Sequence, residues 1–340
     1  MFILVGILGL ALLMVVHELG HHLAARAFGM RVIKFSIGFG PAIWRHQPSG
    51  SSTVYQVALI PFLAYVQIAG MNPFEDYDQN DKSSYANSSL LARMTTIFAG
   101  PFANYVFATV LFFAMYSIWG EAVRSLKIDV IEGGAAEKAQ MHNGDRIRSI
   151  DGRALKDWNE LPEIVRASPN KPLQIEVERS SGSRLLIVTP EKSPTGYGQI
   201  GVKPALQRLS LAEATKKSVI VPAIIATAIV VDLAKTVTGR KKLSMKDLAG
   251  PVAIVGETGK AAKSGMVDFL WLLGLISTYL GVFNLLPIPA LDGGRMVFLG
   301  YEAIARRRPN AKIEAQIHAV GLALLLLLIA VVTVFDIRGQ

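Results

Sequence analysis

The chain has no cysteine among its 340 residues. Disulfide bonds, a cysteine nucleophile and thiolate metal ligands are therefore excluded, although this absence does not identify the compartment. No Gly-x-Ser-x-Gly or Gly-x-Gly-Asp sequence occurs either, which argues against serine and aspartyl chemistry. The net charge is +9, but no basic stripe interleaved with aromatic residues is present, so we exclude nucleic acid as a partner.

Apolar residues are abundant instead. They make up 51% of the chain, and the mean hydropathy is +0.38, which indicates an integral membrane protein. Four segments are long enough to span a bilayer, at about 2–28, 94–119, 267–286 and 315–335. A fifth run, 219–231, is short, contains Pro222 and ends at Asp232, so we predict that it is interfacial or re-entrant.

The first apolar segment contains His17-Glu18-Leu19-Gly20-His21. On a helix this spacing places two imidazoles one turn apart on one face, where both can bind zinc. Glu18 lies beside them, placed to take a proton from a zinc-activated water. A charge at the centre of a membrane costs about 2.5–3.5 kcal/mol, which favours a functional role over chance. The segment lacks a basic start and a small-residue cleavage site, so it is not a removed signal peptide.

Basic residues predict the orientation. They gather in the connections between the first and second spans and between the third and fourth, at Arg31, Lys34, Arg45, Lys82, Arg93, Arg295, Arg306, Arg307, Arg308 and Lys312. With four spans both connections lie on one side, which the positive-inside rule makes cytosolic. The long piece from about 120 to 266 and both termini then face outward. His17 lies about 22 Å from the outer surface at 1.5 Å per residue, inside the bilayer and nearer the cytosol.

A second polar cluster, from Asn284 to Gly294, ends the third span on the same side (NLLPIPALDGG). Its two prolines break the helix, and the freed backbone groups are tolerated in a membrane only within protein or along a cavity. A catalytic zinc needs three protein ligands and one open position. Asp292 is the natural third ligand beside His17 and His21.

With both motifs in view, the chain resembles the site-2 proteases, which are intramembrane zinc metalloproteases. It is most similar to the bacterial group that carries an inserted PDZ domain, the regulator of sigma-E protease group. Gly100-Pro101-Phe102-Ala103-Asn104 matches a third family pattern, and Gly250-Pro251-Val252 resembles a fourth. The resemblance implies one zinc ion per chain held by His17, His21 and Asp292, with Glu18 as the catalytic base. It also implies a bacterial inner-membrane enzyme acting on single-span proteins, such as trimmed anti-sigma factors or signal-peptide remnants.

Two apolar segments, 32–45 and 53–69, are rich in β-forming residues and too irregular to span. They predict a membrane-associated β-hairpin, whose edge could receive an unwound substrate strand. A cytosolic surface hairpin is the alternative. We take Gly38 and Gly40 of this region, together with Asn284 and Asn104, as candidate substrate-binding residues. Asn284 could bind substrate backbone or the developing oxyanion, or cap a helix end, and Asn104 could instead buttress the site.

The outward region, about 122–204, resembles a bacterial PDZ domain. The resemblance lies in Gly133-Gly134-Ala135-Ala136 and in the run from Asn143 to Gly152, followed by strands at 173–179 and 184–190. Gln140 stands where the pattern usually has glycine. Such a domain would bind a peptide end or a trimmed substrate terminus, and a plain structural domain is the alternative.

These observations predict a polytopic α-helical membrane protein with four transmembrane helices, a β-hairpin region and one inserted α+β PDZ domain. The expected parts are 1–119, 120–205, 206–265 and 266–340. A metal transporter and a PDZ-bearing membrane scaffold are the alternative functions. Repeated ligand motifs, which a transporter would favour, are absent, and an intact Glu18 and Asp292 argue against a scaffold. We expect His22 to serve in polar packing and His318 in an interhelical hydrogen bond.

Overall fold

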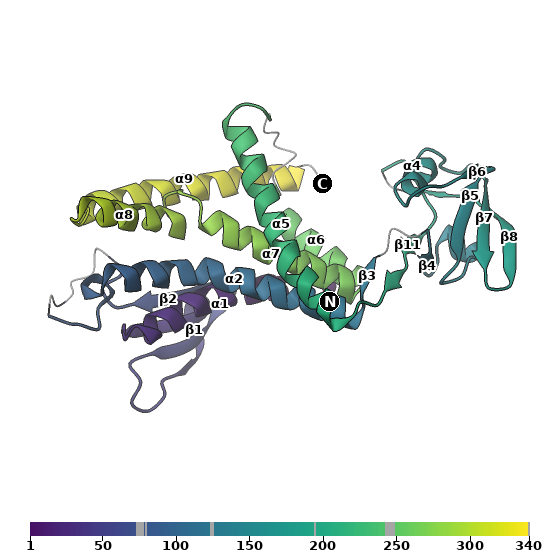
Figure 1. The fold of residues 1–340 in the computed structure, drawn as a ribbon. Helices are drawn as coiled ribbons and strands as arrows, with labels where there is room; N and C mark the ends of the chain where they lie inside the picture. The colour runs from purple at the N-terminus through teal and green to yellow at the C-terminus, as the bar shows by residue number, and fades with distance from the viewer. Residues whose placement is uncertain (73–77, 79, 123–125, 194, 242–248, 339–340) are drawn as a thin grey trace. The chain divides into compact units, whose positions relative to one another are not determined.

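The computed structural model describes residues 1–72, 78, 80–122, 126–193, 195–241 and 249–338. The chain forms two compact units (Figure 1). One, which we call the membrane unit, comprises Met1–Met115 and Thr215–Gln340. The other, which we call the inserted domain, is Tyr116–Ala214. The sequence analysis placed the inserted domain at 120–205.

Five helices in the described part of the chain are long and apolar enough to cross a membrane. They are α1 (Phe2–Ala27), α2 (Leu90–Ile118), α5 (Leu211–Val237), α7 (Met266–Asn284) and α9 (Ala311–Arg338). Four of them match the expected spans. The short run 219–231 is instead the middle of α5, a continuous 27-residue helix that contains Pro222. The re-entrant prediction was therefore wrong, because the polar residues that flank the apolar run extend the helix without breaking it.

Helices α1 and α2 touch backbone to backbone at small residues. A Cβ atom on Gly20 would lie 2.7 Å from the carbonyl carbon of Ala99 and 2.8 Å from Cβ of Ala103. Small residues allow such close approach between membrane helices, where van der Waals packing replaces the hydrophobic effect. Leu13, Leu111 and Leu273 form a buried cluster that joins α1 and α2 to α7. This packing brings the helix that carries His17 and His21 against its neighbours.

Strands β1 (Val32–His46) and β2 (Val54–Ile68) form one sheet that is more folded than the predicted hairpin. The first half of β1 pairs with the end of β2, with Phe35 opposite Val66, and also lies beside its start, with Phe35 next to Tyr55. The second half of β1 pairs with 55–58 of β2. In the described chain, residues 64–68 are thus paired on one side only, which makes them an edge of the sheet.

The described part of the membrane unit also contains two shorter helices and a single turn, η1 (Tyr85–Asn87). Helix α6 (Pro251–Ser264) lies along α1, where a Cβ on Gly6 would meet the backbone of Gly259 at 3.0 Å. The carboxylate of Asp336 on α9 accepts hydrogen bonds from the amides of Gly250 and Ala253 and so caps α6. Helix α8 (Asp292–Ala305) starts at the predicted third metal ligand.

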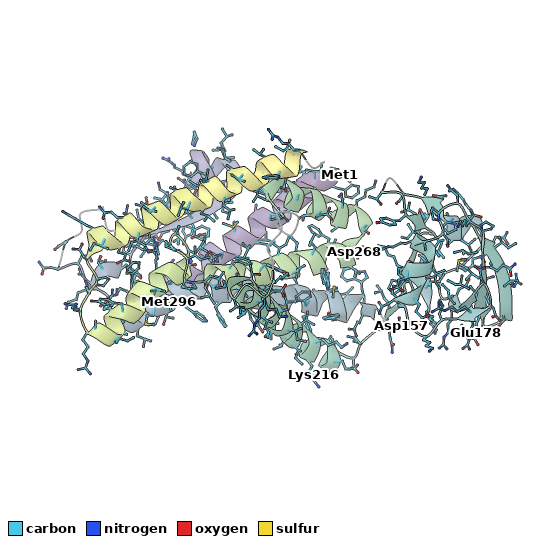
Figure 2. The ribbon with its side chains drawn as sticks, turned by 90° about the horizontal axis from the view of Figure 1, so that it is seen from above. Met1, Asp157, Glu178, Lys216, Asp268 and Met296 are labelled. Atoms are coloured by element: carbon cyan, nitrogen blue, oxygen red, sulfur yellow. The ribbon has the colours of Figure 1, made fainter. Side chains whose placement is uncertain are left out.

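Apolar side chains cover the outside of the membrane unit. Along α9, only 6% of the most apolar 18-residue window is buried, and Leu322, Leu324 and Leu327 are exposed. An exposed apolar surface of this extent requires a lipid environment, so the protein is a multi-pass membrane protein. Met1 and Asp268, at the starts of α1 and α7, lie at one end of the unit, and Met296 of α8 lies at the other (Figure 2).

The inserted domain is an α+β unit, in which the described strand pairs are antiparallel. Its main sheet has the order β6-β5-β7-β8, and the remaining short strands pair in twos. The elements are β3 (Glu121–Ala122), β4 (Ile128–Val130), α3 (Ala135–Lys138), β5 (Arg146–Ile150), β6 (Arg153–Ala154), α4 (Glu160–Arg166), β7 (Leu173–Arg179), β8 (Gly182–Val188), β9 (Glu191–Lys192), β10 (Gly198–Gln199), β11 (Val202–Pro204) and β12 (Leu206–Gln207). Strands β7 and β8 lie where the sequence predicted them. Ile128, Ile147, Ile175 and Val177 form the fully buried core.

One buried ion pair ties the core of the inserted domain together. Arg179 donates to both oxygens of Asp145, at 2.7 and 2.8 Å. Burial favours the neutral acid, but the hydrogen bonds from Arg179 and the amide of His142 outweigh it, so the pKa of Asp145 is lowered. Arg179 also donates to the carbonyl of Gln140, which has a left-handed φ of 63°. This conformation explains why glycine is usual at that position in the resembling pattern.

Candidate active site

Three potential metal ligands from two distant segments meet in the membrane unit. Nε2 of His17 lies 3.1 Å and Nε2 of His21 lies 3.3 Å from Oδ2 of Asp292. The two Nε2 atoms are 3.2 Å apart. Helix α1 carries both histidines, and α8 begins with Asp292, whose carboxylate also suits the positive end of that helix. The structure therefore brings together the three residues that the sequence selected as ligands.

This arrangement fits a zinc ion. Tetrahedral zinc with bonds of about 2.0–2.1 Å separates its ligand atoms by about 3.3–3.4 Å, close to the distances observed here. Oδ2 of Asp292 is buried and has no hydrogen-bond partner within the described chain. Nδ1 of His21 lies 2.7 Å from the carbonyl oxygen of Thr96, which can only accept. His21 therefore carries its proton on Nδ1 and keeps the lone pair of Nε2 for a metal.

Asn104 contacts the other histidine, His17. It is fully buried, and its amide nitrogen lies 3.2 Å from Nδ1 of His17. Its amide oxygen is buried without a partner in the described chain. An amide can present either atom to a neighbour. With its oxygen toward His17, it would accept a hydrogen bond from Nδ1–H and leave the lone pair of Nε2 for a metal. This position suits the buttressing role better than direct contact with a substrate.

Glu18 lies beside the metal ligands and against the edge of the sheet. Its Oε2 accepts a hydrogen bond of 3.0 Å from the backbone amide of Val66. Val66 belongs to the 64–68 segment at the edge of the sheet, which lies next to α1. The candidate base and the backbone of an edge strand are thus in direct contact, an arrangement that sequence reasoning did not predict.

A cavity of about 470 Å³ opens over this site, and we call it the catalytic cleft. Its walls include the ligands, Glu18, Asn284, Arg295 and residues 65–68 of β2. The amide nitrogen of Asn284 donates to the carbonyl of Leu280 at the end of α7, and the residue also lines the cleft. Gly38 and Gly40 do not line it. They lie in β1 with left-handed φ angles, and a Cβ on Gly38 would press on the carbonyl of Ile60.

The loop that carries Asp292 is held from α9. The amide of Ala290, which has a left-handed φ of 77°, donates to Nδ1 of His318 at 2.9 Å. Gly321 lies so close to Pro289 that a Cβ there would fall 2.9 Å from the proline backbone. His318 therefore accepts a hydrogen bond from the loop before α8, and not from another helix as the sequence analysis expected.

His22 packs against the sheet and does not line the cleft beside the three candidate ligands. Its ring packs edge-on against Phe35 and Tyr55 of the sheet, and its Nε2 lies 3.3 Å from the hydroxyl of Tyr55. The expected packing role agrees with these contacts, which join α1 to the sheet one residue after His21.

A second cavity, of about 440 Å³, adjoins the catalytic cleft. Met71, Asn72, Ala290 and Arg295 line both. Arg93 on α2 and Glu302 on α8 meet in its wall, where Nη1 donates to Oε2 at 3.0 Å and Nη2 donates to Oε1. This bidentate pairing lowers the pKa of Glu302 despite partial burial. The pair fastens α8, and with it Asp292, to the start of α2.

The membrane helices and these three candidate ligands indicate a membrane metallopeptidase. The profile of peptidase family M50 matches residues 5–328, and the chain belongs to this family, the site-2 proteases. It is 30% identical to zinc metalloprotease RasP of Geobacillus kaustophilus over 95% of this chain and 94% of the relative. It is also 30% identical to a putative zinc metalloprotease of Clostridium perfringens, over 99% and 98%.

A third relative is the regulator of sigma-W protease RasP of Bacillus subtilis, 28% identical over 95% of this chain and 94% of the relative. The family and these full-length relatives identify the protein as a zinc metalloprotease with Zn²⁺ as its cofactor.

Proposed function

We propose that the protein is an intramembrane endopeptidase that cleaves membrane-spanning segments of other proteins, with His17, His21 and Asp292 as zinc ligands. The observation that carries this proposal is the convergence of the three ligand atoms within helices that face lipid. Bound zinc would supply a Lewis acid that activates water near neutral pH. Glu18 would accept the proton of the attacking water and deliver it to the leaving amine.

The edge of β2 is the proposed docking place for the substrate. A transmembrane helix hides its peptide bonds in internal hydrogen bonds, so it must unwind before cleavage. An unwound strand could pair with residues 64–68, beside Glu18, and Asn284 could bind its backbone from the opposite wall. Substrates with helix-breaking residues near the cleavage site should be preferred, because unwinding costs them less.

The names of the relatives support a proposal for the substrate class. One of them is named a regulator of sigma-W protease, which supports regulated intramembrane proteolysis as the process. We propose single-span membrane proteins already trimmed outside the membrane, either anti-sigma factors or signal-peptide remnants. The inserted domain, read as a PDZ domain on the outer side of a bacterial inner membrane, would admit only trimmed substrates or bind their ends.

Packing in the membrane unit supports four crossings rather than five. Gly9 of α1 packs on Phe269 and Leu273 of α7, so these two helices run in parallel, and α2 runs against them. The end of α2 and the start of α7 therefore lie on the same side. A single crossing by α5 would separate them, and the 14 residues of α6, about 21 Å long, are too short to cross back. We propose that α5 lies in the membrane surface.

Cleavage by Glu18→Gln tests the proposed function. A tagged single-span substrate is incubated in detergent with wild type or the variant at equal bound zinc. We expect the variant to retain zinc and to lose cleavage, because the amide cannot accept a proton. Equal cleavage by both proteins would refute Glu18 as the base. A zinc-loaded wild type that cleaves no trimmed single-span protein would favour the scaffold, and zinc flux across vesicles would favour a transporter.

A further inference from the structure

Arg295 stands out among the basic residues of the membrane unit. It lies one helical turn after Asp292 on α8, beside Met296, which Figure 2 labels. It is half-buried and lines both the catalytic cleft and the second cavity. In the described chain its guanidinium makes no hydrogen bond and no ion pair. Within the described residues, a cation therefore lies at the junction of two cavities with no anion hydrogen-bonded to it.

Glu314 lies close enough to attract the charge of Arg295, but no carboxylate among the described residues forms a hydrogen bond or an ion pair with that guanidinium. Both oxygens of Glu302 are bound by Arg93, and Arg308 lies 3.6 Å from Oε1 of Glu302. Glu314 lines the second cavity but forms no ion pair with Arg295 within the described residues. Removing a guanidinium from water without a bound partner is costly, so an unpaired one in a cleft indicates a ligand that supplies the missing anion.

We propose that Arg295 binds the carboxylate that cleavage creates. This inference rests on the proposed proteolysis. Hydrolysis breaks the C–N bond of the peptide, the oxygen of water joins the acyl carbon, and the amine leaves with the remaining proton. The acyl product then ends in a carboxylate at the metal site. Residues three apart on a helix have Cβ atoms about 5–6 Å apart, so the long Arg295 side chain reaches the space beside Asp292.

Charge explains why such a site is needed. Glu18 and Asp292 already place two carboxylates in the cleft, and the product adds a third in a region shielded from water. A guanidinium can oppose that charge and bind both oxygens of a carboxylate through its planar fork. The product is thus retained at the junction, and the second cavity offers its chain room beyond the cleft. The ligand is a peptide with a free C-terminal carboxylate.

Binding of two matched peptides tests this inference. One has the sequence of the N-terminal cleavage product with a free carboxylate, and the other is its C-terminal amide. Their dissociation constants are measured by fluorescence anisotropy on the full-length, zinc-loaded protein. The proteins are wild type, Arg295→Gln, Arg295→Lys and Arg307→Gln. The last changes an exposed arginine that lines neither cavity and donates to the hydroxyl of Tyr301.

We expect wild type to prefer the acid over the amide, and Arg295→Gln to lower that preference about 10-fold or more, as for a lost charged hydrogen-bonding pair. Arg295→Lys should keep part of it, and Arg307→Gln all of it. Zinc itself favours a carboxylate, so the change in the ratio between proteins, at equal zinc content, isolates Arg295. An unchanged ratio in both Arg295 variants would overturn the proposal.

The outcome stays separate from that of the proposed function, because binding is read without catalysis. If Arg295→Gln fails to fold or to bind zinc, Arg295→Lys provides the test. An Arg295→Lys variant that keeps the full wild-type preference for the acid over the amide, and binds the acid as tightly as wild type at high salt, would refute bidentate binding. A wild type that shows the arginine-dependent preference but cleaves no substrate would refute the proposed proteolysis and leave the carboxylate site standing.

Discussion

Gly100→Ala on α2 should weaken zinc binding, because the added methyl group would displace His21 of α1. Gly100 on α2 faces the ring of His21. A Cβ there would lie 2.5 Å from Cε1 and 2.9 Å from Cδ2, and closer still to Nε2. Ordinary contact begins at 3.4 Å, so the ring or the helix must move by more than about 0.9 Å. The ring cannot simply turn aside, because Nδ1 is bonded to Thr96 and the side chain is 4% exposed.

The expected loss of zinc affinity follows from the narrow range of zinc–ligand distances. Ligand distances vary by about 0.2 Å, well below the required movement. Changes in groups that only orient a ligand weaken metal binding about 10–100-fold, so displacing a ligand itself should cost at least about 100-fold. Alanine in a helix is at the same time more favourable than glycine by about 1 kcal/mol. Overpacking against the buried His21 ring costs about 1–3 kcal/mol and offsets that preference, so zinc affinity should fall without a gain in stability of the metal-free protein.

Zinc competition with a chelator and thermal unfolding of the metal-free protein give the two readings. Gly300→Ala on α8 is the matched control, because a Cβ there would have nothing within 4 Å. It should keep wild-type zinc affinity. If Gly100→Ala also binds zinc as tightly as wild type and cleaves as fast, His21 is not held against α2 as the structure has it, and the reasoning fails.

Three further outcomes are expected. Asn104→Leu should weaken zinc binding about 10–100-fold, and Asn104→Asp, which can still accept from His17, should weaken it less; equal affinities in chelator competition would contradict the orienting role. Because the pKa of Asp145 is lowered, its stabilising effect is complete above the unfolded pKa of about 3.9 and disappears as pH falls through the lower folded pKa. Thermal unfolding of wild type should therefore lose stability in acid more steeply than that of Asp145→Asn, which is already destabilised by about 3 kcal/mol at neutral pH; parallel curves would argue against the Arg179 pair. Since the chain has no cysteine, a single cysteine introduced by Val237→Cys at the exposed end of α5 can be labelled alone. A membrane-impermeant maleimide should reach it from the same side as Arg184→Cys and from the side opposite to Arg307→Cys. Labelling from the same side as Arg307→Cys would make α5 a fifth crossing.

Much of the membrane unit could be predicted because its signals are local. Four apolar segments were long enough to be recognised by length and hydropathy alone, and the structure has helices at each. His17, Glu18 and His21 share one helix turn, so their grouping needs only the helical repeat. Asp292 could be predicted as the third ligand because two prolines and a carboxylate near the end of a span are unfavourable in lipid unless they belong to a functional site. Strands 32–46 and 54–68 were likewise evident from their composition.

The sequence by itself thus determined which segments enter the membrane and which residues can hold a metal. Tertiary structure decided what those residues touch. The bonds from His21 to Thr96 and from Asn104 to His17 join positions 75 and 87 residues apart, and the contact of Val66 with Glu18 depends on which strand lies at the sheet edge. The place of Arg295 between two cavities likewise depends on α8, α9 and the sheet together. Local periodicity specifies the faces of a helix, whereas only the packing of distant segments selects their neighbours.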